Sequence, residues 1–416
     1  MDVCIVRMQE LYDPTALTPM RVARESGYVD WLSQPSTFKR YPEFLFRYPF
    51  DEVESLVLIT LARSVTEEQQ IGGQPYYRLT TPSAGNLHPI ELYIQVRGIK
   101  EVISGIYHVD AKARCFVLVQ EIEGDGLESF FGLHHRFGGI LGVVSMVPYR
   151  SEWKYGNRAI RYCYLDAGHQ LGAITAACQV SEQKCTVLSA FDRNTLDSMM
   201  GFGSQEYSCV GFLIGEQNER EVKALKKPLI EVSAVDYVEK NRTVDAYLTE
   251  MHYPETLEIP KPFLVESQTI LSRRSARKFE PVPLSRQESQ YFLEKLNKAP
   301  EGIEPFIVML RSELVDKGIY STKRAVNEGC YQEIITQLLV DQQFVARAGM
   351  VMVLTSEEFS PATLMKAAAF VHQVSLAAEV KGLGCTGIGA FYDKKLQKFL
   401  DTQNSILYVC ALGKVS

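Results

Sequence analysis

The sequence predicts two copies of one fold that mixes helices and strands, and two internal echoes support that prediction. In the first echo, residues 169–191 and 372–391 each begin with His-Gln in a small-residue helical stretch, then reach Cys-Thr and Ala-Phe. Each stretch is followed by an apolar, strand-like run that ends in glycine, at 210–215 and at 409–413.

The second echo lies upstream in both halves and in the same order. Ile94 precedes a Gly-Ile-Tyr tripeptide at Gly105 by eleven residues, and Ile307 precedes the same tripeptide at Gly318 by eleven. Generic patterning of helices and strands is the alternative explanation for either echo taken alone. Two echoes in one order favour a duplicated fold.

Each copy is expected to contain a strand, a hairpin-like connection, a helix and two further strands. Residues 90–96 are apolar, short and β-branched, which is typical of a buried strand. Residues 166–180 are rich in small side chains over a long stretch, which is typical of a closely packed helix. A further helix is expected at 285–296, after a proline-bearing segment.

Composition divides the chain into four parts. Residues 1–50 are rich in aromatic side chains and predict an N-terminal extension that packs on the first copy, at 51–215. Residues 216–266 are charged and carry four prolines, so they predict a connector, with a helix around 224–251. The second copy is expected at 267–416.

Charge and composition exclude several classes of function. The 44 Lys and Arg residues against 50 Asp and Glu residues give a net charge of −6, which disfavours a dedicated nucleic-acid-binding protein. No apolar run is long enough for a membrane span, and the first residues lack a signal-peptide core, so we expect a cytoplasmic protein without a membrane partner. The nine cysteines form no CxxC pair, and the seven histidines show no metal-ligand spacing. We therefore expect buried thiols and no metal site.

The first motif that could carry chemistry is TTPSAGNLHP, at 80–89. Pro, Ser, Gly and Asn together favour a tight turn with exposed backbone N–H groups. Such a turn can approach the edge of a planar ring and donate hydrogen bonds to it. A plain turn before a strand is the alternative interpretation.

Two further motifs lie in the second half. SRRSARKF, at 272–279, combines arginines that can bind a phosphate bidentately with serine hydroxyls that can add a donor. A solvated charged loop is the alternative. GCTGIGAF, at 384–391, has glycines that allow the backbone to lie close to a ligand. It fits neither the dinucleotide-binding GxGxxG pattern nor a phosphate-binding P-loop.

The fourth motif is WKYGNRAIRYCYLDAGH, at 153–169. Lys154 and Tyr155 are adjacent candidates for proton transfer. Either side chain needs a lowered pKa to act as a base near neutral pH, and proximity to each other or to Arg158 and Arg161 could supply it. A surface lysine beside a packing tyrosine is the alternative.

Together these motifs resemble the flavin-dependent nitroreductase superfamily and, within it, the SagB-type branch of azoline dehydrogenases, the thiazole/oxazole-forming peptide oxidases. That branch shows PSxGxLHPxExY, then GxYHYD, then KYGxRAxRYxxxDxGH, which resemble residues 82–93, 105–110 and 154–169. Residues 28–42 resemble the segment that precedes the domain in these enzymes. The resemblance is strong over 28–215 and generic over 267–416.

The resemblance implies an α+β fold that works as a dimer with two FMN molecules at its interface. In this chain the two subunits are expected to be fused, as two tandem nitroreductase-like domains that form an intramolecular pseudo-dimer, which could itself dimerise. The implied FMN contacts are a turn at the ring (Pro82, Ser83, Ala84, Gly85, Asn86), cationic and hydroxyl groups at the phosphate (Arg273, Arg274, Ser275, Arg277, Lys414) and a second ring contact (Gly387, Ile388, Gly389).

Each half departs from the family pattern where the other keeps it. Residues 299–305 take the place of the turn but lack its serine and asparagine, and residues 62–68 take the place of the cationic segment but bring Glu67 and Glu68. Residues 187–189, Val-Leu-Ser, replace the glycine pair. Since carboxylates repel a phosphate, we expect one competent FMN site per chain and one degenerate site.

The resemblance further implies oxidation of a peptide thiazoline or oxazoline to the azole, with dioxygen as the electron acceptor. Lys154 and Tyr155 would be the base pair that removes the ring proton, and a cyclodehydratase is an implied partner. Two alternatives stay open: an NAD(P)H-dependent nitro or quinone reductase acting on a small molecule, and a degenerate flavin-binding or flavin-free protein that is not an enzyme.

Overall fold

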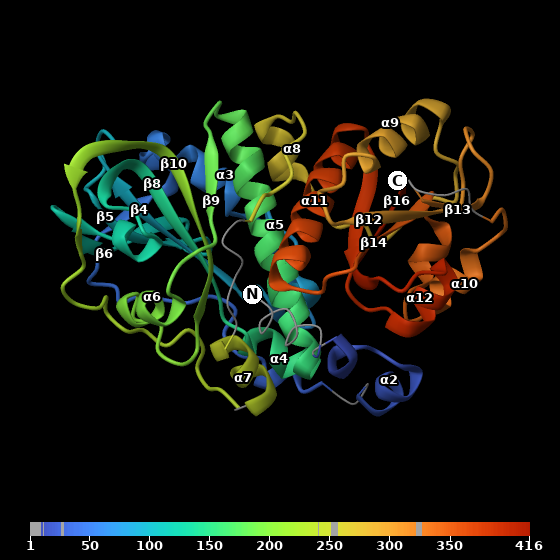
Figure 1. Ribbon diagram of the computed structural model, residues 1–416, viewed down its shortest axis with the longest axis horizontal. Helices are drawn as coiled ribbons and strands as arrows, with labels where there is room; N and C mark the ends of the chain where they lie inside the picture. Colours follow the sequence, from blue (N-terminus) through green and yellow to red (C-terminus); the bar gives the residue numbers. More distant parts are fainter. Residues whose placement is uncertain (1–9, 11, 26–28, 240, 251–256, 322–326) are drawn as a thin grey trace. The chain divides into compact units, whose positions relative to one another are not determined.

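The computed structural model of the chain describes residues 10, 12–25, 29–239, 241–250, 257–321 and 327–416 (Figure 1). The chain divides into two compact units, one formed by residues 30–271 and the other by residues 1–29 together with 272–416. We call them the first and the second unit, after the order of their sheets along the chain.

The first unit is built on a seven-stranded antiparallel sheet whose strand order differs from the chain order. In sheet order its strands are β1 (Arg47–Pro49), β6 (Cys115–Glu121), β5 (Gly105–Asp110), β4 (Ile90–Arg97), β8 (His135–Met146), β10 (Tyr207–Glu221) and β9 (Cys185–Leu188). Two small sheets accompany it, the hairpin β2 (Val65–Ile71) with β3 (Gln74–Leu79), and the parallel pair β7 (Asp125–Gly126) with β11 (Lys223–Ala224).

The helices of the first unit centre on one long buried helix. It is α5 (Ala159–Val180), which lies against β4 and β8 (Figure 1). The others are α3 (Val57–Ala62), α4 (Tyr149–Tyr155), α6 (Arg193–Met199), α7 (Arg242–Glu250) and α8 (Ser267–Ser272), with 3₁₀ turns at Trp31–Ser33, Phe50–Glu52, Glu54–Leu56, Ala84–Asn86, Glu128–Phe131 and Gly156–Arg158. The small side chains predicted at 166–180 allow this close packing, because alanine and glycine let the backbone approach the sheet.

The second unit has a five-stranded antiparallel sheet of the order β13 (Gly318–Ser321), β12 (Glu304–Met309), β14 (Met350–Ser356), β16 (Ser405–Lys414) and β15 (Leu383–Ile388). Its helices are α2 (Pro19–Glu25), α9 (Arg286–Leu296), α10 (Gln332–Leu338), α11 (Pro361–Val380) and α12 (Asp393–Leu400), with a 3₁₀ turn at Gln343–Arg347. The expected helix at 285–296 is confirmed as α9, which begins at a capping box between Ser285 and Glu288.

The repeat seen in the sequence corresponds to a repeated strand register. Ile94 of β4 lies opposite Tyr107 of β5, and Ile307 of β12 lies opposite Tyr320 of β13. The order β5-β4-β8-β10-β9 in one sheet matches the order β13-β12-β14-β16-β15 in the other. The two sheets therefore share strand order and register, while the intramolecular pseudo-dimer stays a prediction.

Residues 1–50 were expected to pack on the first copy; residues 30–50 belong to the first unit, but the described residues before them pack elsewhere. The Ile406 backbone N–H donates a hydrogen bond to Tyr12 Oη (3.1 Å), and Leu17 N–H donates to Asp393 Oδ2 (2.9 Å). Tyr12 also packs edge-on against Phe359, with 5.0 Å between ring centres. The described part of residues 1–29 therefore belongs to the second unit, because its aromatic and backbone groups find partners there.

The helix expected around 224–251 is much shorter in the structure. Among the described residues of this range, only Arg242–Glu250 is helical, as α7. Pro228 has no backbone N–H and is not tolerated in a helix interior. The segment after it instead buries Leu229, Ala234 and Val235, and the Ala234 N–H donates to Gln205 Oε1 (2.9 Å).

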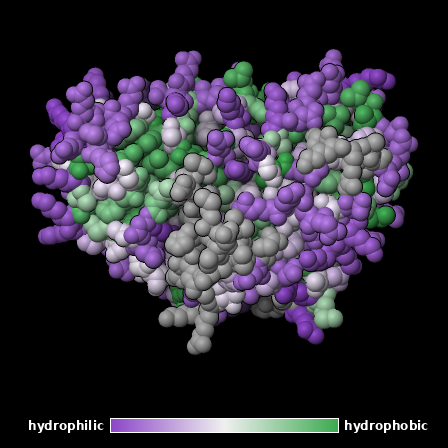
Figure 2. Space-filling model, viewed as in Figure 1, coloured by the Kyte–Doolittle hydropathy of each residue, from purple (hydrophilic) through white to green (hydrophobic). Residues whose placement is uncertain are grey.

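The interior of both units is apolar, whereas the face drawn in Figure 2 is mainly hydrophilic with scattered hydrophobic side chains. Within the described ranges, no helix is both long and apolar enough to cross a membrane.

Candidate functional site

The segment Pro82–Asn86 forms a tight turn directly before β4, as the sequence predicts. Gly85 (φ 63°) and Asn86 (φ 61°) both adopt the left-handed conformation that glycine and asparagine tolerate best. Ser83 Oγ closes the turn by accepting a hydrogen bond from the His88 N–H (2.9 Å). The turn is therefore held by its own polar groups, and it positions Ala84, Gly85 and Asn86 at the start of the sheet.

Asp166 of α5 forms hydrogen bonds with this turn. Its Oδ1 accepts a weak hydrogen bond from the Ala84 N–H (3.4 Å), and its side chain is also hydrogen-bonded to Ser83. The carboxyl group is buried, and Oδ2 has no hydrogen-bond partner among the described residues. Burial raises the pKa of Asp166 to about 7, while its hydrogen bonds to Ser83 and Ala84 act in the opposite direction.

Sequence reasoning did not select Asp166, although it is the aspartate of the motif at 154–169. Its position in the motif was the available signal, but its role depends on a contact with a turn 82 residues earlier.

Tyr155, the last residue of α4, lies against the same turn. A Cβ atom at Gly85 would collide with the Tyr155 hydroxyl, so the absence of a side chain at this position allows the contact. The Tyr155 ring also packs edge-on against Tyr162, with 4.7 Å between ring centres. The structure thus brings the expected proton-transfer tyrosine together with the turn expected at the flavin ring.

Lys154 is half-buried beside aromatic rings. Its Nζ lies 4.6 Å from the centre of the Trp31 ring and 5.3 Å from that of Tyr155. Burial lowers the pKa of Lys154, which is the direction that a general base requires. Trp31, which sequence reasoning missed, packs edge-on against Trp153 (5.6 Å between ring centres).

Arg158 and Arg161, considered for their charge, are both buried. The Arg158 guanidinium donates a hydrogen bond to Tyr162 Oη (3.2 Å) and lies over that ring. Arg158 directly precedes α5, and Tyr162 and Asp166 are spaced four residues apart on α5, so these two side chains lie along one side of the helix. Tyr162 contacts Tyr155, and Asp166 contacts the turn.

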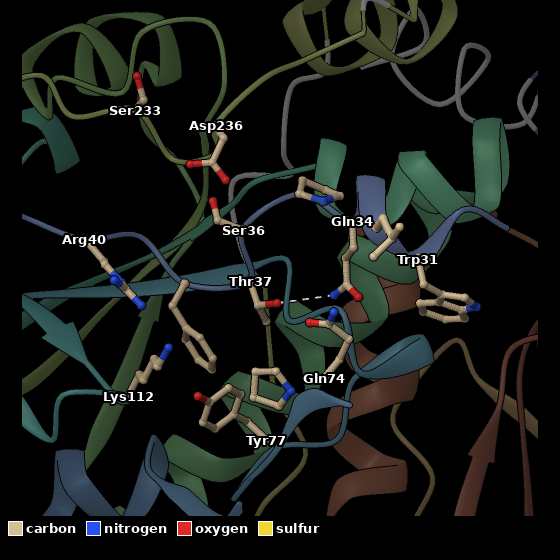
Figure 3. Close-up of a pocket in the computed structure, with 14 residues that line it drawn as sticks. Trp31, Gln34, Ser36, Thr37, Arg40, Gln74, Tyr77, Lys112, Ser233 and Asp236 are labelled. Carbon is tan, nitrogen blue, oxygen red and sulfur yellow. Dashed lines mark hydrogen bonds between the residues drawn. The ribbon is translucent and has the colours of Figure 1, made fainter. Parts of the chain in front are cut away.

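A cavity of about 530 Å³ opens beside Trp31 (Figure 3). Its lining combines aromatic rings, prolines, amides, hydroxyls and three charged side chains: Trp31, Leu32, Gln34, Pro35, Ser36, Thr37, Phe38, Arg40, Gln74, Pro75, Tyr77, Lys112, Ser233 and Asp236. All of these residues belong to the first unit.

In the second unit, the cationic segment lies beside β15. Ser275 pairs with Cys385 in a parallel bridge, and the Ala276 N–H donates to the Cys385 carbonyl (3.0 Å). Arg273 is buried, and burial together with the charge of Arg274 lowers its pKa to about 10. The structure thus brings the Arg273–Arg277 segment next to the strand that ends in the Gly-Ile-Gly sequence.

The Gly-Ile-Gly sequence closes β15. A Cβ at Gly387 would collide with the Tyr408 hydroxyl, so a glycine is needed there for packing as well. The Ile388 side chain is buried in the hydrophobic core, which leaves its backbone for any ligand contact. Gly389 follows the strand.

The outer cations of this group differ in their surroundings. Arg277 is exposed and lies over the Phe344 ring, 5.2 Å from its centre. The Lys414 ammonium forms an ion pair with Glu288 Oε1 (2.5 Å). A phosphate contact by Lys414 would therefore compete with a carboxylate that is already in place.

The predicted site residues thus form two groups, each within one unit. The turn and the Lys154–Tyr155 pair belong to the first unit, and the cationic and glycine segments belong to the second. Their union in one flavin site stays a prediction. No group of three or more His, Cys, Asp or Glu that could hold a metal occurs in the described part of the chain, and most of its cysteines are buried thiols.

Comparisons with known proteins agree on one family. Residues 270–414 match the model of the nitroreductase family. A protein of Methanocaldococcus jannaschii that carries the provisional name of nitroreductase is 29% identical over 93 residues, which are 22% of this chain and 47% of that protein. The chain therefore spans about half the length of the curated relative it matches.

A crystal structure from Anabaena variabilis, also provisionally named a nitroreductase, superposes with a TM-score of 0.80 at 19% identity, over 98% of this chain and 99% of that chain. A chain of the Escherichia coli microcin synthetase McbBCD complex gives a TM-score of 0.32 at 14% identity, over 52% of this chain and 94% of that chain, a level that carries no conclusion. The whole chain therefore shares its mixed helix-and-strand fold with the Anabaena protein, and residues 270–414 match the model of the nitroreductase family.

Proposed function

We propose that the protein is an FMN-dependent oxidoreductase that dehydrogenates peptide thiazolines or oxazolines to azoles, with dioxygen as the final electron acceptor. The observation that carries the proposal is the contact between the Tyr155 hydroxyl and the turn at Gly85, next to the half-buried Lys154. This arrangement sets two proton-transfer groups beside the turn that would lie at the edge of a planar ring.

The residues present suit a flavin mononucleotide. Burial and the charge of Arg274 lower the pKa of Arg273, and a dianionic phosphate beside it would favour its charged form. The left-handed backbone at Gly85 and Asn86 forms a tight turn whose Asn86 N–H donates to the Ser83 carbonyl (3.1 Å), so a flavin ring edge would meet a turn that is held in place by its own hydrogen bonds. When bound, FMN would supply two-electron redox chemistry, accepting a hydride from the substrate.

The protein's own groups have defined tasks in this proposal. A thiazoline or oxazoline becomes aromatic when it loses a proton from one ring carbon and a hydride from the next. Lys154 is the stronger candidate for the base that accepts the proton, since burial lowers its pKa and favours the neutral amine. The Tyr155 hydroxyl, fixed between Gly85 and Tyr162, would orient the ring and relay the proton.

The proposal includes one FMN per chain. In the first unit, the residues in the place of the cationic segment include Glu67. This glutamate lies on the hairpin strand β2 and forms an ion pair with Arg78 (3.2 Å). The measurement is flavin absorbance against protein concentration after loading with FMN. A ratio near one FMN per chain supports the single competent site, and a ratio of two contradicts it. No bound flavin after loading would favour the non-enzyme alternative.

The proposed reaction is tested with a synthetic thiazoline peptide, by measuring azole formation and oxygen consumption. Lys154→Ala should abolish azole formation while FMN stays bound, and Tyr155→Phe should slow it strongly. Lys223→Ala, which removes an exposed lysine of β11, is the matched control and should keep full activity. Full turnover by both site variants would exclude the assigned roles.

An anaerobic experiment separates the reductase alternative. If NAD(P)H bleaches the flavin rapidly and the thiazoline peptide does not, the protein is a reductase and the azoline proposal fails. If the peptide bleaches the flavin and NAD(P)H does not, the dehydrogenase proposal stands. Because azolines form by cyclodehydration of Cys, Ser or Thr residues in a peptide, the proposal also implies a cyclodehydratase that supplies the substrate.

A further inference from the structure

We infer that the cavity beside Trp31 is a peptide subsite that binds an acidic segment flanking the reacting ring. The inference rests on the proposed function for the identity of that ring, but the binding it describes can be measured without turnover. It assigns the cavity to one class of ligand, a short peptide with carboxylate side chains.

The cavity is connected to the candidate site through Trp31. The Trp31 ring lines the cavity, and the Lys154 ammonium lies over the same ring at 4.6 Å. A peptide seated in the cavity would therefore reach the proposed base across a single side chain.

A second connection runs through the floor of the cavity. Phe38 and Tyr77 line it and pack edge-on against each other, with 5.3 Å between ring centres. His88 stacks on Phe38 (5.9 Å), and its Nε2 is within hydrogen-bond distance of the Tyr77 carbonyl (3.0 Å) and of Asn86 Oδ1 (3.1 Å). The floor is thus continuous with the turn, so the cavity and the candidate site belong to one packed structure.

The charges of the lining select the ligand. Arg40 and Lys112 lie on the same side of the view in Figure 3, away from Trp31. In the part of the chain that the structure describes, neither cation forms an ion pair, and the Lys112 ammonium lies 5.1 Å from the Tyr77 ring centre. Asp236 is the one carboxylate of the lining, so the lining carries a net positive charge that favours an acidic ligand.

The remaining lining suits a peptide backbone. Gln34 and Thr37 are joined by a hydrogen bond from Nε2 to Oγ1 (3.4 Å), and Gln74 faces the same space (Figure 3). Amides and hydroxyls of this kind donate and accept hydrogen bonds, as peptide groups require. A volume of about 530 Å³ lies within the usual range for ligand pockets and admits a few residues.

The chain supplies its own probe of binding. Of its two tryptophans, Trp31 lines the cavity and Trp153 packs against Trp31, so tryptophan fluorescence reports on occupancy. The ligand is a hexapeptide with two glutamates, compared with the same peptide carrying two glutamines or two lysines. We expect the glutamate peptide to bind at least tenfold more tightly than the other two, with an affinity that falls as salt rises.

The double variant Arg40→Gln, Lys112→Gln should weaken binding of the glutamate peptide about tenfold. The matched control Lys100→Gln, Lys223→Gln removes the same charge at two exposed lysines outside the cavity, and should change the affinity less than twofold. Equal affinity for the three peptides, or equal loss in both double variants, would overturn the inference.

Turnover separates this inference from the proposed function. With thiazoline peptides that carry flanking glutamates, the Arg40→Gln, Lys112→Gln variant should raise KM about tenfold and leave kcat unchanged. If the rate of oxidation does not depend on the flanking charge, the subsite inference is wrong and the dehydrogenase proposal stands. If binding depends on charge but no oxidation occurs, the subsite inference stands and the dehydrogenase proposal is wrong.

Discussion

The two sheets carry a glutamate at the same register position, in very different surroundings. Glu91 on β4 and Glu304 on β12 each stand three residues before the isoleucine that faces the Gly-Ile-Tyr strand. Glu91 is buried and contacts Arg150, His108 and Arg63. Glu304 is half-buried and accepts hydrogen bonds from the neutral Ser321 and Asn404.

The same contrast appears in the long helices. Counted from the shared His-Gln pair, Asp166 of α5 corresponds to Ala369 of α11. A shared fold thus accommodates different charged side chains at corresponding positions of the two units.

The largest expected effect comes from removing the buried carboxylate. Glu91→Gln should cost about 3–5 kcal/mol, because it leaves Arg150 and Arg63 buried without their counter-charge. The counterpart Glu304→Gln should cost about 1 kcal/mol, since Glu304 is half-buried and solvent screens its charge. Urea unfolding followed by tryptophan fluorescence reports on the first unit, and circular dichroism reports on both. Equal losses of unfolding free energy in the two variants would contradict the difference between the surroundings of Glu91 and Glu304.

Asp166 should make stability depend on pH. Burial raises its pKa to about 7 from an ordinary value near 4, so the folded state favours the protonated carboxyl. The stabilisation of the folded state by protonated Asp166 is complete below about pH 4. It is lost as the pH rises towards 7, an effect of order 3 kcal/mol on the free energy of unfolding. Asp166→Asn should flatten that part of the stability profile, measured by thermal unfolding between pH 4 and 8. An unchanged slope in the variant would mean that Asp166 is ionised in the folded state.

Gly85 before β4 and Gly302 before β12 separate the cost of backbone strain from the cost of a displaced contact. Gly85 (φ 63°) faces Tyr155, while Gly302 (φ 81°) has open space where a Cβ would stand. Gly302→Ala should therefore cost about 1 kcal/mol from backbone strain alone. Gly85→Ala should cost about 2–3 kcal/mol, since it also displaces the tyrosine, and it should reduce azoline oxidation. Similar costs and full activity would show that the contact is not needed.

Lys414 should give the smallest effect. Its ion pair with Glu288 is partly exposed, so Lys414→Gln should cost less than about 1 kcal/mol. It should also weaken FMN binding less than Arg274→Gln, for which we expect a loss of about tenfold. Titration of FMN by flavin fluorescence checks both variants. A greater loss for Lys414→Gln would show that this lysine leaves Glu288 to bind the phosphate.

Much of the fold and part of the site could be predicted from the sequence. The strand at 90–96, the helix at 166–180 and the duplication follow from apolar periodicity and repeated residues, which act over short distances along the chain. The turn at 82–86 followed from its proline, glycine and asparagine, because their backbone preferences are local. The motif at 153–169 placed Lys154 and Tyr155 in one short segment.

The packing of the described N-terminal residues, the shortening of the helix expected around 224–251 and the partners of the charged groups were decided by the tertiary structure. Tyr12 contacts Ile406, and Asp166 contacts Ala84, across separations of 394 and 82 residues that no local pattern encodes. The sequence by itself determined which segments become strands, helices and turns, because these depend on local preference and periodicity. Only the tertiary structure decided which side chains are buried beside which charges, because burial and distance set the pKa of Asp166 and the pairing of Lys414.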